Sequence, residues 1–381
     1  MPTVLLAFDS FKGSVRAEKL TDALVCHLHR SFPTFRILPF PVADGGEGTT
    51  DMLAYSLSVK RILCQVHDPL MEPIAASYIV TSEGIAVIEM AAASGLPLVE
   101  PSRRNPTETT TFGTGELIRD ALKRGYRKFI LGLGGSATND AGMGMLHALG
   151  VRFYDKQGVE LFPVGKNLIQ VGRIDTSKLC PELKCAQFVL ACDVTNPFYG
   201  EQGAAVVYAP QKGATTEQVA QLDAGLQSYA AVLLREMEYD LTQVTGAGAA
   251  GGMGGGLLPF LKAEIKSGID ILLDTVKFDE ALDGTDLILT GEGKLDRQTI
   301  MGKAVSGVLK RALAHHIPVI GLGGCVEDEE LLAQQGFTAI ASIHSSGISV
   351  EDAMKEEVTL QHLCDTAERM VRNYFIYHKN I

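Results

Sequence analysis

The sequence is poor in positive charge. Its 34 lysine and arginine residues are outnumbered by 45 aspartate and glutamate residues, and the formal net charge is −11. A protein whose main partner is nucleic acid needs a basic face for the phosphate backbone, so this composition argues against that function. It does not exclude a small anion held in a local basic pocket. We therefore expect small-molecule substrates and no nucleic-acid partner.

Long apolar runs and paired cysteines are also missing. No run approaches the roughly 20 residues that span a bilayer, and the N-terminus lacks the basic stretch and cleavage site of a secretory signal. The seven cysteines include no C-x-x-C pair, and an odd number without zinc-ligand spacing is typical of reduced thiols. These absences predict a cytoplasmic protein without a membrane partner.

Several catalytic signatures are absent. There is no G-x-x-x-x-G-K-[ST], no H-R-D or D-F-G, no H-E-x-x-H and no G-x-S-x-G. A P-loop fold and a protein kinase are therefore excluded.

Glycine, in contrast, is abundant. The 40 glycines gather at 132–144, 246–256 and 291–293, which indicates site loops and not a linker. The side chains of the segment 246–256 are so small that its backbone could pass close to a flat ligand or to phosphates. The same composition would suit a hinge between domains or close helix packing.

Apolar strands alternate with amphipathic helices, which predicts a doubly wound α/β fold. Strands are expected at 4–8, 37–40, 287–289, 318–322 and 338–342, and helices at 17–28, 304–315 and 356–377. Between 61 and 90 three short strands follow one another without helices, which indicates mixed sheet. The α/β pattern then resumes, with helices expected at 115–124, 141–149 and 216–235 and strands at 128–133 and 188–192.

This pattern predicts two α/β domains facing a cleft. Residues 1–65 and 283–381 would form a discontinuous Rossmann-like domain with a doubly wound, mostly parallel sheet. Residues 66–282 would form a large inserted α/β domain with a mixed sheet.

The most informative loop is expected at 290–299, closed by Lys303. It follows the strand 287–289 and precedes the helix 304–315, so it lies where an open α/β sheet binds ligands. Glycines let backbone N–H groups approach an anion, whereas carboxylates suit a metal ion or a proton transfer. The mixture suggests phosphate plus magnesium.

Two loops near the N-terminus carry similar chemistry. Lys12, before a predicted helix, could bind a phosphate oxygen, or it could be a solvated lysine beside a helix cap. Asp44 and Glu47 flank a Gly-Gly turn and could hold magnesium or accept a proton from a substrate hydroxyl. A glycine turn with a capping aspartate is the alternative.

A rival function is indicated by the loop after the strand 128–133. Residues 132–137 fit the dinucleotide fingerprint G-x-G-x-x-A, and Asp155 follows where a ribose-binding acid would lie. A nicotinamide-dependent oxidoreductase of a small hydroxy acid is therefore an alternative. However, Asn139 and Asp140 crowd the position of the pyrophosphate, and this favours a hydrogen-bonding cradle for substrate or nucleotide.

A further loop contains Asp193 and Asn196. An aspartate at a strand end with an asparagine three residues later could anchor magnesium or a hydroxyl, although an Asx turn before proline is the alternative. Lys212 nearby could supply a cation.

In this order the loops resemble the type-1 glycerate kinase family. The matching segments are 9–14, 42–49, 134–140, 192–197, 211–214, 248–252, 290–296, 298–299 and 302–303. Phe8 stands where the family usually has proline, and Ala141 where it often has glycine; neither change removes a functional group. The resemblance implies ATP and Mg²⁺, D-glycerate as substrate and usually 2-phosphoglycerate as product.

Phosphoryl transfer depends on positioning and charge neutralisation, and we assign hypothetical roles on that basis. Asp193 or Asp296 would orient or deprotonate the glycerate hydroxyl, and Lys12 would offset developing charge. The metal ligands would be Asp44, Glu47 and Glu292. The expected substrate- or nucleotide-binding residues are Ser136, Asn139, Asp140, Asn196, Lys212, Lys294, Arg297, Gln298 and Lys303.

Two questions stay open at this point. A non-catalytic small-ligand-binding regulator on the same scaffold is a further alternative to the kinase. The oligomeric state is not encoded in any motif, and a homodimer is compatible with the sequence.

Overall fold

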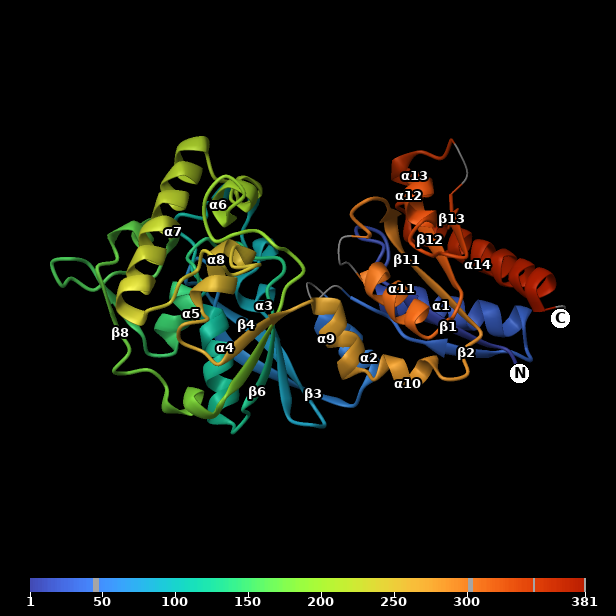
Figure 1. Ribbon diagram of the computed structural model, residues 1–381, viewed down its shortest axis with the longest axis horizontal. Helices are drawn as coiled ribbons and strands as arrows, with labels where there is room; N and C mark the ends of the chain where they lie inside the picture. Colours follow the sequence, from blue (N-terminus) through green and yellow to red (C-terminus); the bar gives the residue numbers. More distant parts are fainter. Residues whose placement is uncertain (44–47, 301–303, 345–346, 380–381) are drawn as a thin grey trace. The chain divides into compact units, whose positions relative to one another are not determined.

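The protein divides into two compact units. The computed structural model describes residues 1–43, 48–300, 304–344 and 347–379 (Figure 1). Unit 1 comprises Met1–Asp44, Asp51–Leu57 and Ile269–Ile381, and unit 2 comprises Gly45–Thr50 and Ser58–Gly268.

Unit 1 is built on a parallel sheet of five strands. Their spatial order is β13-β12-β11-β1-β2, and the bounds are β1 Thr3–Phe8, β2 Arg36–Pro39, β11 Leu287–Leu295, β12 Val319–Val326 and β13 Ala339–Ser342. All six residues of β1 are buried, as expected for a central strand covered on both faces. Side chains alternate between the faces: Val4, Leu6 and Phe8 belong to one hydrophobic cluster, whereas Leu5 lies outside it.

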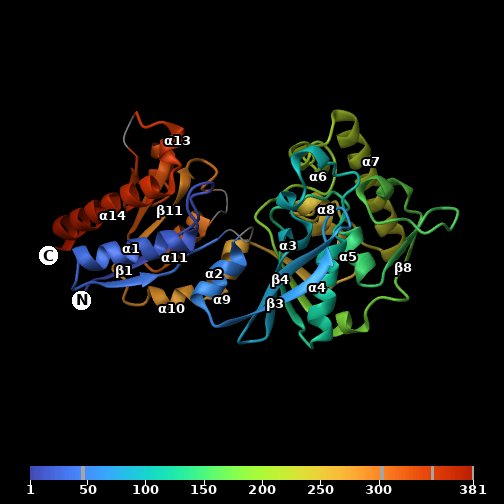
Figure 2. The ribbon, with the colours of Figure 1, turned by 180° about the vertical axis from the view of Figure 1, so that it is seen from behind.

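The helices of unit 1 cover both faces of this sheet. Their bounds are α1 Ala17–Ser31, α2 Thr49–Ser56, α9 Gly268–Thr275, α10 Phe278–Leu282, α11 Ala304–Ala314, α12 Glu329–Ala333, α13 Val350–Ala353 and α14 Glu356–Lys379. The helices α1 and α14 lie side by side and share a hydrophobic cluster with β1 and β11 (Figures 1 and 2). On α11, Gly307 lies against Ile269 of α9, where a Cβ would be 2.5 Å from Ile269 Cγ1.

Strand order reverses at β1. The chain leaves β1 through α1 to reach β2 on one side, and the next strand of the unit, β11, pairs with β1 on the other side. In open α/β sheets the crevice outside the carboxyl ends of the strands at such a reversal is the usual ligand site. The carboxyl ends of β1 and β11 are therefore the candidate ligand site of unit 1.

The structure corrects the expected boundary of one strand. Residues 290–295, expected as a loop, continue β11, and the pairing with β12 extends to Leu295↔Val326. Glycine makes this possible: a Cβ on Gly291 would lie 1.9 Å from the Leu322 carbonyl oxygen, and one on Gly324 would lie 2.6 Å from that of Gly293. These glycines let two strands approach each other, a role that a sequence pattern does not separate from anion binding.

Unit 2 contains a mixed six-stranded sheet. Its order is β10-β9-β6-β5-β4-β3, with bounds β3 Val59–His67, β4 Pro73–Thr81, β5 Ile85–Glu89, β6 Lys128–Gly132, β9 Gln187–Ala191 and β10 Ala263–Lys266. The β3–β4 and β4–β5 pairs are antiparallel, and β5, β6, β9 and β10 are parallel to one another. A separate antiparallel pair is formed by β7 Arg152–Tyr154 and β8 Arg173–Asp175.

Six α-helices and five short 3₁₀ helices complete unit 2 within its described residues. The α-helices are α3 Ala91–Ser94, α4 Phe112–Lys123, α5 Met143–Ala148, α6 Ala204–Tyr208, α7 Thr216–Met237 and α8 Ala249–Gly256; the 3₁₀ helices are η1 Leu96–Leu98, η2 Pro101–Arg103, η3 Gly165–Gln170, η4 Pro181–Cys185 and η5 Pro210–Lys212. Helix α7 starts where the sequence predicted, because Thr215 and Gln218 form a capping box.

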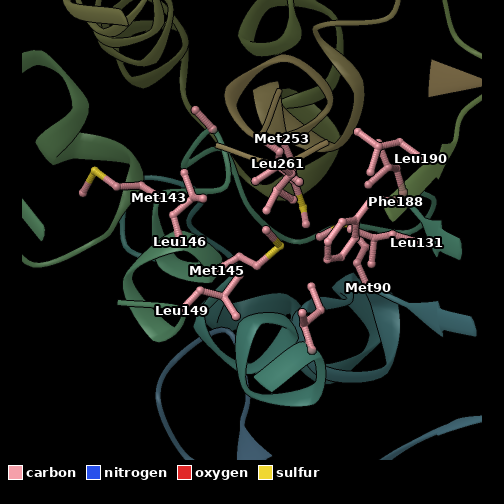
Figure 3. Close-up of a cluster of buried hydrophobic side chains, with 14 of the residues drawn as sticks. Met90, Leu131, Met143, Met145, Leu146, Leu149, Phe188, Leu190, Met253 and Leu261 are labelled. Carbon is pink, nitrogen blue, oxygen red and sulfur yellow. The ribbon is translucent and has the colours of Figure 1, made fainter. Parts of the chain in front are cut away.

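The core of unit 2 joins the parallel strands to the surrounding helices. Phe129 of β6 stacks on Phe188 of β9, with ring centroids 4.5 Å apart. Figure 3 shows Leu131, Phe188 and Leu190 from the strands together with Met145 from α5 and Met253 from α8. Continuous apolar packing of this kind holds the carboxyl ends of the strands in place.

The glycine-rich segment 246–256 packs inside unit 2. Within α8, Ala250, Gly251 and Gly252 adopt positive φ, and the segment turns sharply there. A Cβ on Gly251 would lie 2.1 Å from the Thr138 carbonyl oxygen, and one on Gly256 would lie 2.0 Å from that of Ala141. Of the alternatives raised by the sequence, the structure therefore favours close packing over a hinge.

The predicted fold class is confirmed: both units are α/β, one with a parallel and one with a mixed sheet. The division into domains 1–65 with 283–381 and 66–282, and the cleft between them, stay predictions. The compact units differ from that division at three places. Residues 45–50 belong to unit 2, and so does all of β3, because it pairs along its length with β4. Residues 269–282 belong to unit 1.

Each of the seven cysteines is a free thiol. Within the described part of the chain, every helix is too short or too polar to cross a membrane.

Candidate active site

In unit 1, several of the predicted site residues lie where β1 and β11 end. Asp9 follows β1, is 6% exposed, and donates its backbone N–H to the Gly291 carbonyl oxygen of β11 at 2.9 Å. The next turn carries Lys12, whose backbone N lies 3.5 Å from the position of a Cβ on Gly293. The reversal of strand order thus brings the Lys12 loop beside the glycine-bearing part of β11.

The Lys12 loop is held by the C-terminal segment of the chain. Helix α1 starts only at Ala17, so Ser14 does not cap it. Instead, Ser14 Oγ is hydrogen-bonded to Thr359 Oγ1 at 2.7 Å, and Gly13 lies under Met354, whose Cε would be 2.6 Å from a Cβ there. The loop geometry is therefore set by tertiary contacts and not by a helix cap.

Thr299 links the two carboxylates that the sequence singled out. Its hydroxyl donates to Glu292 Oε1 at 2.8 Å and accepts from the backbone N–H of Asp296 at 3.0 Å. Glu292 is 9% exposed and Thr299 is 1% exposed. Asp296 Oδ1 in turn accepts from the backbone N–H of Gln298 at 2.7 Å. A buried hydroxyl therefore fixes the position of Glu292 relative to Asp296.

Lys294 lies between acidic groups at the end of β11. Its Nζ is 2.9 Å from Glu327 Oε2 and 3.3 Å from Asp296 Oδ2. Hydrogen bonds to Glu327 and Asp296 raise the pKa of Lys294, so it is a cation at neutral pH. Arg297 and Gln298 are exposed beside this group. The structure therefore brings Glu292, Lys294 and Asp296 together within unit 1; their roles stay predictions.

Three predicted residues lie outside the described residues: Asp44, Glu47 and Lys303. Among the described residues, no three His, Cys, Asp or Glu side chains group to hold a metal ion. Magnesium in phosphoryl-transfer sites commonly takes only one or two carboxylates and completes its shell with water and phosphate oxygens. Glu292, a buried carboxylate that accepts a hydrogen bond from the Thr299 hydroxyl, fits that mode.

In unit 2, Asp140 is buried and fully engaged with the backbone around it. Its Oδ2 accepts from the N–H and hydroxyl of Thr111, both at 2.8 Å, and from the N–H of Gly144 at 3.1 Å; its Oδ1 accepts from the N–H of Gly142 at 3.2 Å. Burial raises the pKa of Asp140, and these hydrogen bonds oppose that shift. Asp140 therefore organises the loop, and its role as a ligand to substrate stays a prediction.

Lys212 is buried against the same loop. It is 2% exposed, and its Nζ donates to Ser136 Oγ and to the Thr138 carbonyl oxygen, both at 2.7 Å. Burial lowers the pKa of Lys212 to about 7, and the negative charge of Asp140 opposes the shift. The structure thus joins Lys212 to Ser136, a residue 76 positions away.

Neighbouring polar atoms are buried without protein partners. Both amide atoms of Asn139 and the hydroxyl of Thr138 lack hydrogen-bond partners among the described residues, although both side chains are completely buried. Buried polar groups in native proteins are nearly always satisfied, by water or ligand where not by protein. The loop after β6 therefore carries unused hydrogen-bonding capacity.

Asp193 and Asn196 lie on the loop after β9. Asp193 Oδ1 accepts from the backbone N–H of Gly268 at 2.9 Å. The Asn196 side chain donates to the Gln202 carbonyl oxygen at 2.9 Å and accepts from the Tyr208 hydroxyl at 2.6 Å. The backbone of this loop packs on the glycine-rich segment, as does the loop after β6.

Sequence reasoning overlooked other residues at these edges. Glu89, the last residue of β5, accepts from the backbone N–H of Thr50 at 2.6 Å. A run of threonines before and within α4 is nearly completely buried and holds the loop after β6: Thr107, Thr109, Thr110, Thr111 and Thr114. Thr109, for example, donates to the Ala137 carbonyl oxygen at 2.9 Å. Five threonines in eight residues were a visible signal.

The dinucleotide fingerprint lacks its structural context. Asp155 lies in the turn after β7, where Oδ1 accepts from the backbone N–H groups of Gln157 and Val159. The strand before it, β7, pairs with β8 in an antiparallel pair that is separate from the six-stranded sheet. A ribose-binding acid should instead follow the next parallel strand of the same sheet.

Together these features define an α/β protein whose acidic and basic side chains gather at the carboxyl ends of parallel strands. A model of the glycerate kinase family matches residues 4–374. The chain therefore belongs to the glycerate kinase family, and it is a kinase.

Individual relatives resemble the chain over nearly its whole length. A glycerate kinase of Haemophilus influenzae is 43% identical over 371 residues, which cover 97% of each chain. A glycerate 2-kinase of Escherichia coli (strain K12) is 41% identical over 354 residues, covering 92% of this chain and 93% of that protein. A crystal structure from Salmonella typhimurium LT2, of a protein proposed to be glycerate kinase 2, has 39% identity and a TM-score of 0.83, and covers 97% of this chain.

Proposed function

We propose that this kinase transfers the γ-phosphoryl group of ATP, in the presence of Mg²⁺, to a hydroxyl group of D-glycerate and forms 2-phosphoglycerate. The observation that carries the proposal is the family match over residues 4–374. The 2-position is supported by the Escherichia coli relative, which is called a glycerate 2-kinase.

The side chains of unit 1 suit the phosphate chemistry. Lys12 and Lys294 would offset the charge that develops on the transferred phosphoryl group, together with Lys303. Asp296 would orient the attacking hydroxyl or take its proton, with Arg297 and Gln298 nearby for binding. The hydrogen bond from the Gln298 backbone holds Asp296 in place for that task.

Magnesium would be held by Glu292, with Asp44 and Glu47 as further ligands. When bound, the ion neutralises phosphate charge during transfer. The role of the protein chain is to hold the carboxylate in place, and Thr299 does this for Glu292.

The side chains of unit 2 suit recognition of the acid. Ser136, Asn139 and Lys212 combine a hydroxyl, an amide and a buried ammonium group on one loop and its neighbour. Asp140 and Asn196 would shape this binding surface through their backbone contacts. Asp193 is a second candidate for the group that orients the hydroxyl.

A coupled assay of ADP release with D-glycerate tests the reaction, and phosphorus NMR of the product identifies the phosphorylated hydroxyl. We expect ADP release that depends on both D-glycerate and Mg²⁺, and a product signal coupled to the C2 proton. ADP release that does not depend on D-glycerate would show that D-glycerate is not the substrate. Coupling of the phosphorus signal to the C3 protons would show that the 3-hydroxyl is phosphorylated instead of the 2-hydroxyl.

Three expectations from the sequence stay predictions beside this proposal. They are the cytoplasmic location, the homodimer and the absence of a nucleic-acid partner. The oxidoreductase and regulator alternatives lose their support with the kinase family match and with the turn position of Asp155.

A further inference from the structure

The buried ammonium group of Lys212 has only neutral hydrogen-bond acceptors in the described part of the chain. Nζ donates to a hydroxyl and to a carbonyl oxygen, and no carboxylate forms an ion pair with it there. Burying a charge without a counter-ion is costly unless something else supplies the opposite charge. An anionic ligand would supply it.

Ser136 is the partner of Lys212 that a ligand can reach. Its hydroxyl oxygen accepts from the ammonium group, so its own hydrogen is directed elsewhere and is available to an acceptor. Ser136 retains 8% exposure, whereas Lys212 retains 2%. A hydroxyl that accepts a bond from a cation also donates more strongly, because hydrogen bonds in a chain polarise one another.

A second observation points to a ligand at this loop. The residue that supplies the carbonyl oxygen to Lys212 is Thr138, and its own hydroxyl is buried without a partner among the described residues, as is the whole amide of Asn139. The Lys212 cation from η5 and the polarised hydroxyl and unused donors of the loop after β6 together match the needs of a carboxylate.

We propose that Ser136 and Lys212 form the carboxylate-recognition pair of this kinase: the Ser136 hydroxyl donates to a carboxylate oxygen of the hydroxy acid, and Lys212 supplies positive charge behind it. This inference rests on the proposed function, because it takes the acid as substrate. Lys212 does not contact the acid itself. It orients and polarises the Ser136 hydroxyl, and it is therefore a positioning residue.

The pair makes binding of the acid dependent on pH. The charged group that acts on Lys212 is the Asp140 carboxyl from the loop after β6. Asp140 favours the ammonium form, but burial outweighs it and lowers the pKa of Lys212 to about 7. Above that pH the free enzyme must take up a proton to bind the anion. The KM for D-glycerate should then rise with pH, by up to about tenfold per pH unit.

Steady-state kinetics with saturating ATP between pH 6.5 and 8.5 test the proposal. At pH 7, Lys212→Met should raise the KM for D-glycerate by about 10- to 100-fold, the loss expected for a hydrogen bond with charge assistance, while kcat changes less. The variant should also lose the rise of KM with pH. Ser136→Ala should raise KM too, and Lys212→Met added to it should have little further effect, because the two residues act as one unit.

Lys166→Met is the matched control, since Lys166 is an exposed lysine of the same unit paired with Glu108. Its KM and pH dependence should equal those of the wild type. Calorimetry of D-glycerate binding at pH 8 in two buffers of different ionisation enthalpy should show proton uptake in the wild type and none in Lys212→Met.

If Lys212 only stabilised the fold, its replacement would change the melting temperature and not the KM for D-glycerate. Replacing a buried cation by an apolar side chain of similar length should leave the melting temperature unchanged or raised if the charge serves binding. A lowered melting temperature with KM and its pH dependence unchanged would overturn the proposal. If the wild type itself does not phosphorylate D-glycerate, the proposed function fails and this inference with it; if only the Lys212→Met result is negative, the proposed function stands.

Discussion

The hydroxyl of Thr299 donates a 2.8 Å hydrogen bond to Glu292, and both side chains are buried. Thr299 lies on the turn after β11, whereas Glu292 lies within the strand. The bond therefore couples the position of a candidate metal ligand to the turn that carries Asp296.

Thr299→Val should lower the affinity of the enzyme for Mg²⁺ or its Mg²⁺-dependent activity. Valine matches threonine in shape but lacks the hydroxyl, so Glu292 loses its hydrogen bond from Thr299. Loss of such a supporting hydrogen bond typically lowers metal affinity or activity by about 10- to 100-fold. The measurement is ADP release as a function of Mg²⁺ concentration. Thr299→Ser keeps the hydroxyl and should retain most activity; equal magnesium dependence in wild type and Thr299→Val would disprove the coupling.

Asp296→Asn should lower kcat by about two to four orders of magnitude if Asp296 accepts the proton of the attacking hydroxyl. The fold should survive, because the asparagine oxygen can still accept from the Gln298 backbone. Circular dichroism and the melting temperature check the fold. Asp193→Asn is the companion variant: a larger loss there, with near-wild-type turnover in Asp296→Asn, would move the role to Asp193.

Gly256→Ala should destabilise unit 2. The added Cβ would lie 2.0 Å from the Ala141 carbonyl oxygen, a backbone atom that cannot move aside. Overpacking of a well-packed core typically costs about 1–3 kcal/mol, and 1 kcal/mol shifts the melting temperature by about 2–4 °C at this size. We expect a loss of about 2–12 °C by calorimetry.

Gly225→Ala, in the interior of α7, is the control for that experiment. Its nearest contacts would be 3.3–3.8 Å, so the methyl group fits with little adjustment. Alanine also favours a helix over glycine by about 1 kcal/mol. Its melting temperature should be unchanged or raised; a loss as large as that of Gly256→Ala would mean that close backbone packing is not the cause.

Glu368 should make unit 1 sensitive to acid. Arg372, Ser31 and His27 donate to its carboxylate and lower its pKa to about 2, from an ordinary value of 4.5. A carboxylate with a lowered pKa stabilises the fold above its unfolded-state pKa. The stabilisation is therefore present above about pH 4.5 and is lost as the pH falls toward 2.

Urea unfolding of wild type and Glu368→Gln between pH 7 and 3 measures this contribution. The variant should be less stable at pH 7, by roughly 1 kcal/mol or less because the pair is partly exposed. The difference should shrink as the pH is lowered through 4. A stability difference that is constant over this range would show that the charge of Glu368 is not the cause.

Elements with strong local signals were predicted closely. The predicted helix 216–235 is α7, Thr216–Met237, because capping box and apolar period are both local properties of the chain. The helix 356–377 is likewise α14, Glu356–Lys379. The strand at 287–289 was predicted too short, since the polar residues 290–295 gain their strand conformation from pairing with β12.

The candidate site was predicted in part for the same reason. Glu292, Lys294 and Asp296 lie within one segment, and the structure keeps them together. The contact between Ser136 and Lys212 spans 76 positions, and the one between Ser14 and Thr359 spans 345. Spacing along the chain carries no information about such pairs.

The sequence by itself determined the α/β class, most element positions and the loops that carry chemistry, because periodicity, caps and residue types act over a few residues. Only the tertiary structure decided which polar groups are buried, which are already satisfied and which remain available. Asp140 and Lys212 show the difference, because both are buried polar residues of the same region. Asp140 accepts hydrogen bonds from three backbone N–H groups and one hydroxyl, whereas Lys212 donates to a hydroxyl and a carbonyl oxygen and has no carboxylate partner in the described part of the chain. Burial and hydrogen-bond satisfaction depend on segments that meet only after folding.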